Sequence, residues 1–305
     1  MPSFYYGGQA VIEGVMMRGR SSAAVAVRAP DRRVVLHEER LESQLYRSPV
    51  ARWPFIRGMV LLWETLILGT RMMLFASSVA QPADEHAEQP VKPAAASDPR
   101  VLLPMLFSLA FAVTLFFLLP LGITGLLSHW LGTGTVSLLF EGLLRLGILI
   151  GYLALIGRLP DIQRVFQYHG AEHKAINAFE AGEPLDVAHV RAASRVHTRC
   201  GTGFLLIIVV ISIILFALLG NPPLVWRVLS RIVLVPVIAG IGYELLRLGA
   251  RFYHVPLVKM LMAPSLALQG LTTREPDDTQ IECAITALDA VLRTDGTLPA
   301  EPRAA

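Results

Sequence analysis

The sequence predicts a mainly α-helical membrane protein with about four transmembrane helices, a small cytoplasmic N-terminal β segment and a cytoplasmic helical link. Three observations support this fold class. Only 17% of the 305 residues are charged and 53% are hydrophobic, whereas about 25% of an average soluble domain is charged. The mean hydropathy is +0.53. The apolar residues also gather in stretches near the length of about 20 residues that a helix needs to cross a bilayer.

The N-terminal segment, residues 1–52, is predicted to be β-rich, because short apolar runs alternate with turn-like Arg-Gly-Arg and Ala-Pro-Asp-Arg sequences. Residues 53–80 are apolar but contain Arg57, Glu64 and Arg71. Charges are costly inside a bilayer, so this segment is predicted to be an interfacial or packed helix. Residues 81–100 are rich in Pro, Ala and acidic residues and are predicted to form a disordered linker.

The rest of the chain divides into apolar and polar segments. Residues 101–157 are predicted to hold transmembrane helices one and two, and residues 203–250 to hold helices three and four. Between these pairs, residues 158–202 are predicted to form a cytoplasmic helical link containing His, Glu and Cys. Residues 251–293 are predicted to form a cytoplasmic interfacial segment and an amphipathic helix, and residues 294–305 a disordered tail.

Arginine and lysine gather before the first predicted span and in the link, while the other two loops carry none. The positive-inside rule therefore predicts that both termini are cytoplasmic. Membrane topology accounts for the net charge of +3, so nucleic acid is not expected as a partner. Membrane lipid is the expected partner, and a homo-oligomer or an unknown protein partner is compatible with the sequence. Cys200 and Cys283 are expected to be reduced thiols.

The segment His169-Gly170-Ala171-Glu172-His173 carries the strongest chemical signal. On a helix, the two histidines at i and i+4 project from one face, with the glutamate beside them. Two imidazoles suit zinc, and the carboxylate can act as ligand or general base; the string also has the H-x-x-E-H form of one metallopeptidase class. Alternatively, the histidines bond to backbone groups and Glu172 pairs with Lys174 or an arginine. Gly170 is costly inside a helix, which predicts close approach of another backbone.

His197 and Cys200, spaced H-x-x-C, can complete a site with His169 and His173. If all four bind zinc the site is closed and structural, whereas three ligands leave an open position for water. Cys200 can equally be a small buried residue at a helix start.

Five further residues are weaker candidates. Glu244 could be a ligand or pair with Arg247 or Arg251, the ion pair being slightly favoured. The glycine-rich segment near Gln9 and Glu13 could be a lid over the histidines with both side chains pointing inward, or a strand with glycine bulges. Glu141 and Arg145, spaced i and i+4, are predicted to form an ion pair within a helix.

Five motifs together resemble a bacterial family of uncharacterised multi-pass membrane proteins labelled as predicted metal-dependent enzymes. They are GGQAVIEGVMMRG, YHGAEHKAINAFE, HTRCGTGF, GYELLR and LTTREPDD, and the resemblance runs from Tyr6 to about Leu292. It implies a multi-pass protein of the bacterial cytoplasmic (inner) membrane and adds no substrate. The site residues that it implies are His169, Glu172, His173, His197 and Cys200.

The leading functional hypothesis is a hydrolytic membrane enzyme that uses a divalent metal, with zinc as the expected cofactor. His169 and His173 are then ligands, Glu172 is the base, and His197, Cys200 or Glu244 supplies the third ligand. The rival hypothesis is a channel, transporter or assembly factor with a structural metal or none, in which Glu141, Arg145 and Glu244 could line a pathway.

Overall fold

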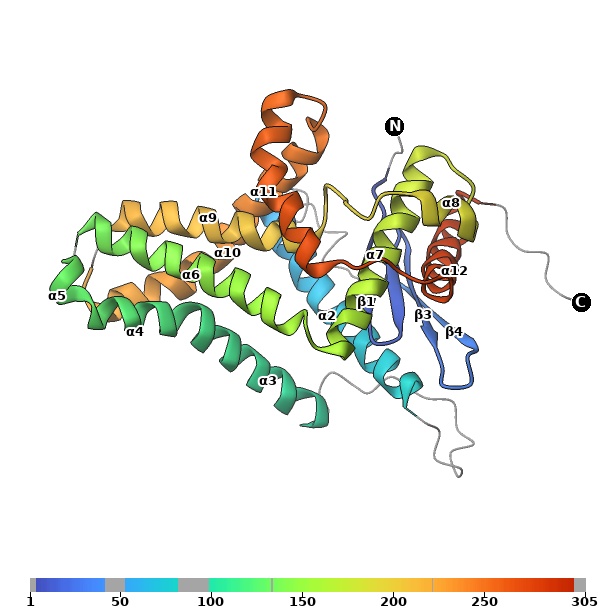
Figure 1. Ribbon diagram of the computed structural model, residues 1–305, viewed down its shortest axis with the longest axis horizontal. Helices are drawn as coiled ribbons and strands as arrows, with labels where there is room; N and C mark the ends of the chain where they lie inside the picture. Colours follow the sequence, from blue (N-terminus) through green and yellow to red (C-terminus); the bar gives the residue numbers. More distant parts are fainter. Residues whose placement is uncertain (1–3, 42–52, 82–98, 133, 221, 299–305) are drawn as a thin grey trace, which may run out of the picture.

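The computed structural model describes residues 4–41, 53–81, 99–132, 134–220 and 222–298. A helical bundle makes up one part of the molecule, and a sheet flanked by helices lies at one end of that bundle (Figure 1). Most of the predicted linker, at positions 82–98, lies outside the described residues. So do positions 42–52 of the predicted β-rich segment and 299–305 of the predicted tail.

Four antiparallel strands follow one another in chain order. They are β1 (Gly7–Val11), β2 (Gly14–Arg18), β3 (Ser22–Arg28) and β4 (Val34–Arg40). In the register of the first pair, Gly8 lies opposite Met17. Two residues join β1 to β2, and the second, Glu13, has a φ of 54°, the left-handed conformation that a type II turn has at its second central residue. The predicted small antiparallel sheet is confirmed.

Both faces of the sheet are covered. Helix α2 (Ile56–Ala80) packs on one face, where Met16 and Val25 meet Met72. Helices α7 (Pro160–Ala181) and α12 (Asp278–Thr294) pack on the other, where the neighbouring strand residues Met17 and Ala24 enter a second core. Successive side chains of a strand point to opposite faces. The interior residues of β2 and β3, Val15–Met17 and Ala23–Val27, are therefore apolar on both faces, because each face has its own core.

The ends of α7 and α12 follow from local sequence. Pro160 opens α7, and Gly182 ends it in the left-handed conformation with a φ of 77°, the usual roles of these residues. Asp277 and Gln280 form a capping box at the start of α12. After α7, Asp186 caps the short helix α8 (Val187–Ala192). Helix α12 forms where an amphipathic helix is expected and buries its apolar face against the sheet.

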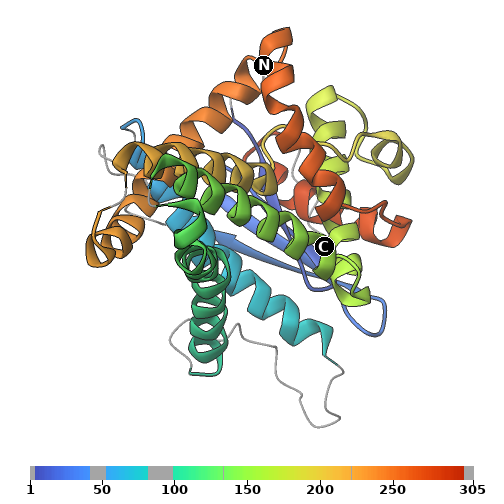
Figure 2. The ribbon, with the colours of Figure 1, turned by 60° about the vertical axis from the view of Figure 1, so that its left-hand side comes forward.

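The bundle is made of the remaining helices, with α9 in contact with both α6 and α10 (Figure 2). In chain order they are α3 (Pro99–Val113), the π-helix η2 (Thr114–Leu118), α4 (Leu119–Leu126), α5 (Ser128–Leu131), α6 (Thr135–Ile156), α9 (Gly201–Leu219), α10 (Leu224–Arg251) and α11 (Pro256–Thr272). The predicted ion pair between Glu141 and Arg145 is present inside the bundle, with 2.8 Å between the charged atoms.

Five helices among the described residues are long and apolar enough to cross a membrane, so the predicted number of four spans is not confirmed. They cover Ile56–Ala80, Leu106–Leu126, Thr135–Ile156, Gly201–Leu219 and Val225–Arg251. The additional candidate is α2. Its charged residues Arg57, Glu64 and Arg71 all have ion-pair partners, namely Glu244, Arg18 and Glu39.

Candidate metal centre

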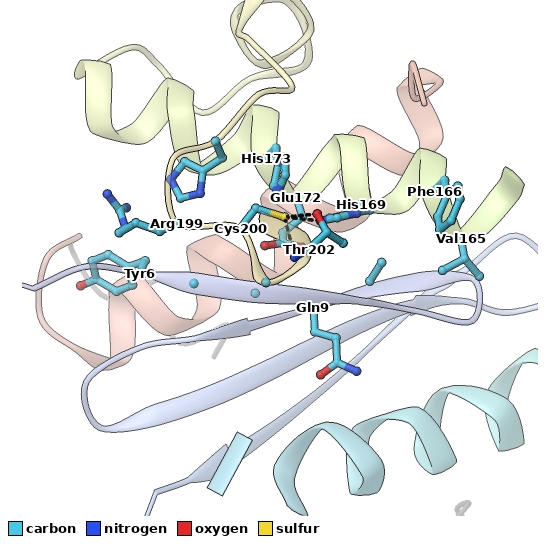
Figure 3. A pocket seen from close by; sticks show the side chains of 15 residues that line it. Tyr6, Gln9, Val165, Phe166, His169, Glu172, His173, Arg199, Cys200 and Thr202 are labelled. Carbon is cyan, nitrogen blue, oxygen red and sulfur yellow. Dashed lines mark hydrogen bonds between the residues drawn. The ribbon is translucent and has the colours of Figure 1, made fainter. Parts of the chain in front are cut away.

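Three potential metal ligands meet at the junction of the sheet and the bundle. His169 and His173 come from one face of α7, and Cys200 immediately precedes α9 (Figure 3). One ligand atom from each lies within 4.8 Å of the others. The Cys200 Sγ is 3.3 Å from the His169 Nε2, and the centroids of the two imidazole rings are 4.4 Å apart. The helical i and i+4 spacing thus produces the predicted shared face.

Backbone carbonyls orient both imidazoles. The Nδ1 of His169 is 2.8 Å from the carbonyl oxygen of Thr272, and the Nδ1 of His173 is 2.6 Å from that of Arg195. A carbonyl oxygen only accepts, so each Nδ1 carries the proton and each Nε2 keeps a free lone pair. Zinc-binding histidines are commonly held in this way by a partner on the second ring nitrogen. The alternative interpretation expected the histidines to bond to backbone groups. They do so, and the same hydrogen bonds also orient them as metal ligands.

Two glycines allow the surrounding segments to approach α7. A Cβ on Gly170 would overlap the carbonyl oxygen of Arg274, so the predicted close approach of another backbone is confirmed. That approach brings the carbonyl of Thr272 to His169, and the amide of Arg274 donates to the carbonyl of Phe166 at 2.8 Å. On the opposite side, a Cβ on Gly8 of β1 would lie 2.8 Å from the Cγ of Glu172.

Cys200 occupies the N-cap position of α9 and is 4% exposed. Its sulfur accepts a hydrogen bond from the Thr202 amide at 3.4 Å and lies 3.0 Å from the hydroxyl of the same residue. That hydroxyl is in turn 3.2 Å from the Thr272 hydroxyl. Cys200 is thus a buried residue at a helix start, as the alternative interpretation held, and its sulfur is at the same time directed toward His169.

Glu172 lies in the same cavity as the three potential ligands and is 5% exposed. Burial raises its pKa to about 7, although His169 and the backbone of Gly8 act to lower it. The expected alternative of pairing with Lys174 is wrong, because the Lys174 ammonium is 2.6 Å from Glu275 and donates to the carbonyls of Arg191 and Ala193. A carboxyl group with a pKa near neutrality suits proton transfer.

The metal-site cavity, as we call it, has a volume of about 340 Å³, which is within the usual range for small-molecule sites. Residues 6–10, around β1, line one side of it. Residues of α7 and of the segment 197–202 line the remainder. The cavity is therefore lined by segments that are far apart in the sequence.

His197 lies in this cavity but outside the group of three. Its ring centroid is 5.5 Å from that of His173, and its Nε2 is 3.8 Å from a carboxylate oxygen of Glu180, too far for a hydrogen bond. Burial lowers its pKa, against the opposing effect of Glu180. The Glu180 carboxylate also pairs with Arg199. Of the four ligands of the predicted closed site, the structure thus brings three together.

The weaker candidates are placed elsewhere. The backbone of Gln9 lines the cavity, but its side chain points to the opposite face of the sheet and contacts Gly69 of α2 (Figure 3). Glu13 forms an ion pair with Arg164 and hydrogen-bonds to the Tyr168 hydroxyl at 3.3 Å. The prediction that the side chains of Gln9 and Glu13 point into the site is therefore wrong.

Glu244 is also remote from the three ligands. Its carboxylate lies 2.7 Å from the Nε of Arg57. The expected ion pair is present, but the partner is Arg57 of α2 in place of Arg247 or Arg251. Sequence reasoning also missed Thr272 and Arg195, whose carbonyls hold the histidines. A backbone carbonyl carries no side-chain signal, and Thr272 is 103 positions from His169.

The apolar helices and the group of two histidines and a cysteine define a class: a multi-helix protein compatible with a membrane location, with a candidate metal site between its bundle and its sheet. The chain belongs to the family described as "Protein of unknown function (DUF1385)", which matches residues 53–294. It is 35% identical over 295 residues to "Uncharacterized protein YqhQ" of Bacillus subtilis (strain 168), covering 95% of this chain and 93% of that protein.

No solved structure matches the chain. The predicted resemblance to a family of uncharacterised proteins is confirmed, and neither description mentions a metal or an enzyme. The family match includes His169, Glu172, His173 and Cys200 and begins after the sheet.

Proposed function

We propose that this protein is a zinc-dependent hydrolase of the bacterial cytoplasmic membrane whose site faces the cytoplasm. The observation that carries the proposal is the approach of three ligand atoms of His169, His173 and Cys200 to within 4.8 Å beside the buried Glu172. Imidazole and thiolate ligands suit zinc, and three protein ligands leave one coordination position for water.

The donor set supports zinc in further ways. Each histidine is oriented through Nδ1, so both Nε2 atoms are available. Zinc bound there would lower the pKa of its water to near neutrality. Glu172 would take a proton from the attacking water and return it to the leaving group, so that one bond of the substrate is cleaved and one water molecule is consumed.

The shared core of the sheet supports a four-span topology. The sheet, α7 and α12 pack together and must lie on the same side of the membrane. Helices α9 and α10 provide two crossings between α7 and α12. Between β4 and α7 the chain contains three candidate spans, namely α2, the span Leu106–Leu126 and α6. Because the sheet and α7 lie on the same side, the number of crossings between them must be even, so one of the three does not cross. Helix α2 is that helix, because it packs on the sheet.

The arginines and lysines of the link support a cytoplasmic location of this shared side by the positive-inside rule. Both termini are then cytoplasmic, and the metal-site cavity lies where α9 enters the membrane. Lipid is the surrounding partner of the spans. Substrate would reach the site from the cytosol or from the cytoplasmic leaflet.

Elemental mass spectrometry of the purified protein tests the metal site. We expect about one equivalent of zinc in the native chain and in Glu172→Gln, and loss of zinc in His169→Ala and Cys200→Ala. His197→Ala is the matched control, since it removes a buried histidine of the same cavity whose nitrogen is outside the group of three. Absence of zinc from the native protein after reconstitution would refute the proposal.

A second measurement separates a catalytic from a structural metal. Activity toward a panel of chromogenic esters and phosphoesters should fall by a factor of about 10² to 10⁴ in Glu172→Gln, the usual contribution of a general base. Equal activity of this variant and the native protein, with zinc bound in both, would instead support a structural site in a non-enzymatic membrane protein.

A further inference from the structure

A second cavity, which we call the bundle cavity, lies inside the helical bundle. It has a volume of about 250 Å³ and is lined by residues of η2, α6, α9 and α10. The lining is almost entirely apolar, with Leu149, Ile208 and Phe216 among its walls. Arg145 and Ser212 are its main polar residues, and the Arg145 guanidinium is held by Glu141 and by the carbonyl of Phe116 at 2.9 Å. A cavity of this composition suits a hydrocarbon chain.

Helix α9 lines both cavities. Gly201, its first residue, lines the metal-site cavity, and Leu205, Ile208 and Ser212 line the bundle cavity. The spacings of four, three and four place all of them on one face of the helix. Over this interval α9 rises by about 16 Å, so the two cavities lie in series along the direction in which the helix enters the bundle.

A route between them would begin at Gly201, which is an open position. A Cβ on Gly201 would meet no atom within 4 Å, although the residue lines the metal-site cavity. Gly201 is exposed, and Leu205, one turn further into the bundle, is 42% exposed. The metal-site cavity is thus open on the side where α9 enters the membrane, and the opening continues onto an apolar helical face.

Resting on the function proposed above, we propose that the substrate is an amphiphile: its polar head group binds beside His169, His173, Cys200 and Glu172, and its hydrocarbon tail passes Gly201 into the bundle cavity. A tail in this cavity moves from the apolar bilayer into contact with apolar side chains, and its binding there positions the head group at the site. Arg199, which lines the metal-site cavity and pairs with Glu180, provides a cation beside the head group.

The test uses palmitic acid with a photoreactive diazirine near the end of its chain, added to the full-length protein in lipid nanodiscs. Its carboxylate is an oxygen ligand for zinc, and its tail reports position. After illumination, mass spectrometry should find the label on peptides of α6 and α9 that line the bundle cavity. Gly201→Phe should lower that labelling about tenfold, because its ring fills the opening.

Gly147→Phe is the matched control. Gly147 is also an exposed helical glycine with no atom within 4 Å of its Cβ, but it lies on the opposite side of α6 from Arg145 and Leu149. Labelling in this variant should equal that of the native chain. Equal labelling in Gly201→Phe would overturn the proposal, since lipid would then fill the bundle cavity directly from the bilayer.

Zinc content is measured on the same samples and keeps the two proposals distinguishable. Gly201→Phe should retain its zinc, so that loss of labelling reports a blocked tail. Labelling that depends on Gly201 in a protein without zinc would refute the metal-dependent function and leave the tail cavity supported. Zinc-loaded protein without labelling of the bundle cavity would refute the amphiphile and leave the metal site supported.

Discussion

Gly170→Ala should weaken zinc binding without altering any ligand. The added Cβ would overlap the Arg274 carbonyl oxygen far more closely than packed atoms approach, so the segment after α11 would have to retreat by about 1 Å or α7 would have to move. Two hydrogen bonds depend on this approach, from the Arg274 amide to Phe166 and from the His169 Nδ1 to Thr272, each 2.8 Å long. The substitution therefore reaches the ligand through its orienting carbonyl.

The magnitude follows from these contacts. Overpacking of this kind costs about 1–3 kcal/mol, and each weakened hydrogen bond about 0.5–1.5 kcal/mol. The better helix propensity of alanine returns about 1 kcal/mol. We expect a net loss of about 2 kcal/mol in the free energy of unfolding. Loss of the orienting partner of a zinc-binding histidine should lower zinc affinity by a factor of about 10 to 100.

Competition for zinc with a chromogenic chelator measures the affinity, and denaturation in mixed detergent measures the stability. Gly270→Ala is the control, because Gly270 is a helical glycine of α11 with no atom within 4 Å of its Cβ. This control should bind zinc as the native chain does. The reasoning is wrong if Gly170→Ala matches Gly270→Ala in both measurements.

Three other predictions test separate parts of the structure. In zinc-free protein, the pKa of Glu172 is raised, so that above the ordinary pKa of 4.5 the folded state holds a proton that the unfolded state releases. Native stability should therefore fall by up to about 3 kcal/mol as the pH rises from about 4.5 to 7. Glu172→Gln should lack this fall when unfolding is compared at pH 5 and pH 8. Glu244→Gln should leave zinc content unchanged, because its carboxylate pairs with Arg57, and loss of zinc would restore Glu244 as a ligand. Glu141→Gln and Arg145→Met should each lower the stability of the bundle by about 3 kcal/mol, as for buried ion pairs generally. In a double-mutant cycle, the double variant should lose less stability than the sum of the two single losses. Additive losses would show that the pair is not coupled.

The helical part of the site could be predicted because its signals are local. The spacing of His169 and His173 fixes a shared face on any helix, and Gly170 marks a close approach whichever segment makes it. The direction of Gln9 could not be predicted in the same way. Its neighbours in β1 are glycine and alanine, whose small side chains do not show which face of the strand is buried.

Long-range contacts account for the remaining differences. Glu244 pairs with a residue 187 positions earlier, and nearby arginines were the only partners that the sequence could suggest. Composition does not fix the number of spans, for a related reason. An apolar helix that packs on a sheet, as α2 does, has the same composition as one that crosses a bilayer, and only the shared core of the sheet, α7 and α12 distinguishes the two.

That shared core also constrains how the chain is made. The strands are synthesised before α7 and α12, but α7 follows two of the proposed crossings and α12 follows two more, so one face of the sheet stays uncovered until α12 has emerged. A chain with one misinserted helix would carry α12 on the wrong side of the membrane and leave that face permanently exposed. In the proposed topology, closure of the sheet by α12 would be a check on membrane insertion, and incompletely inserted chains would present an apolar sheet to cytoplasmic proteases.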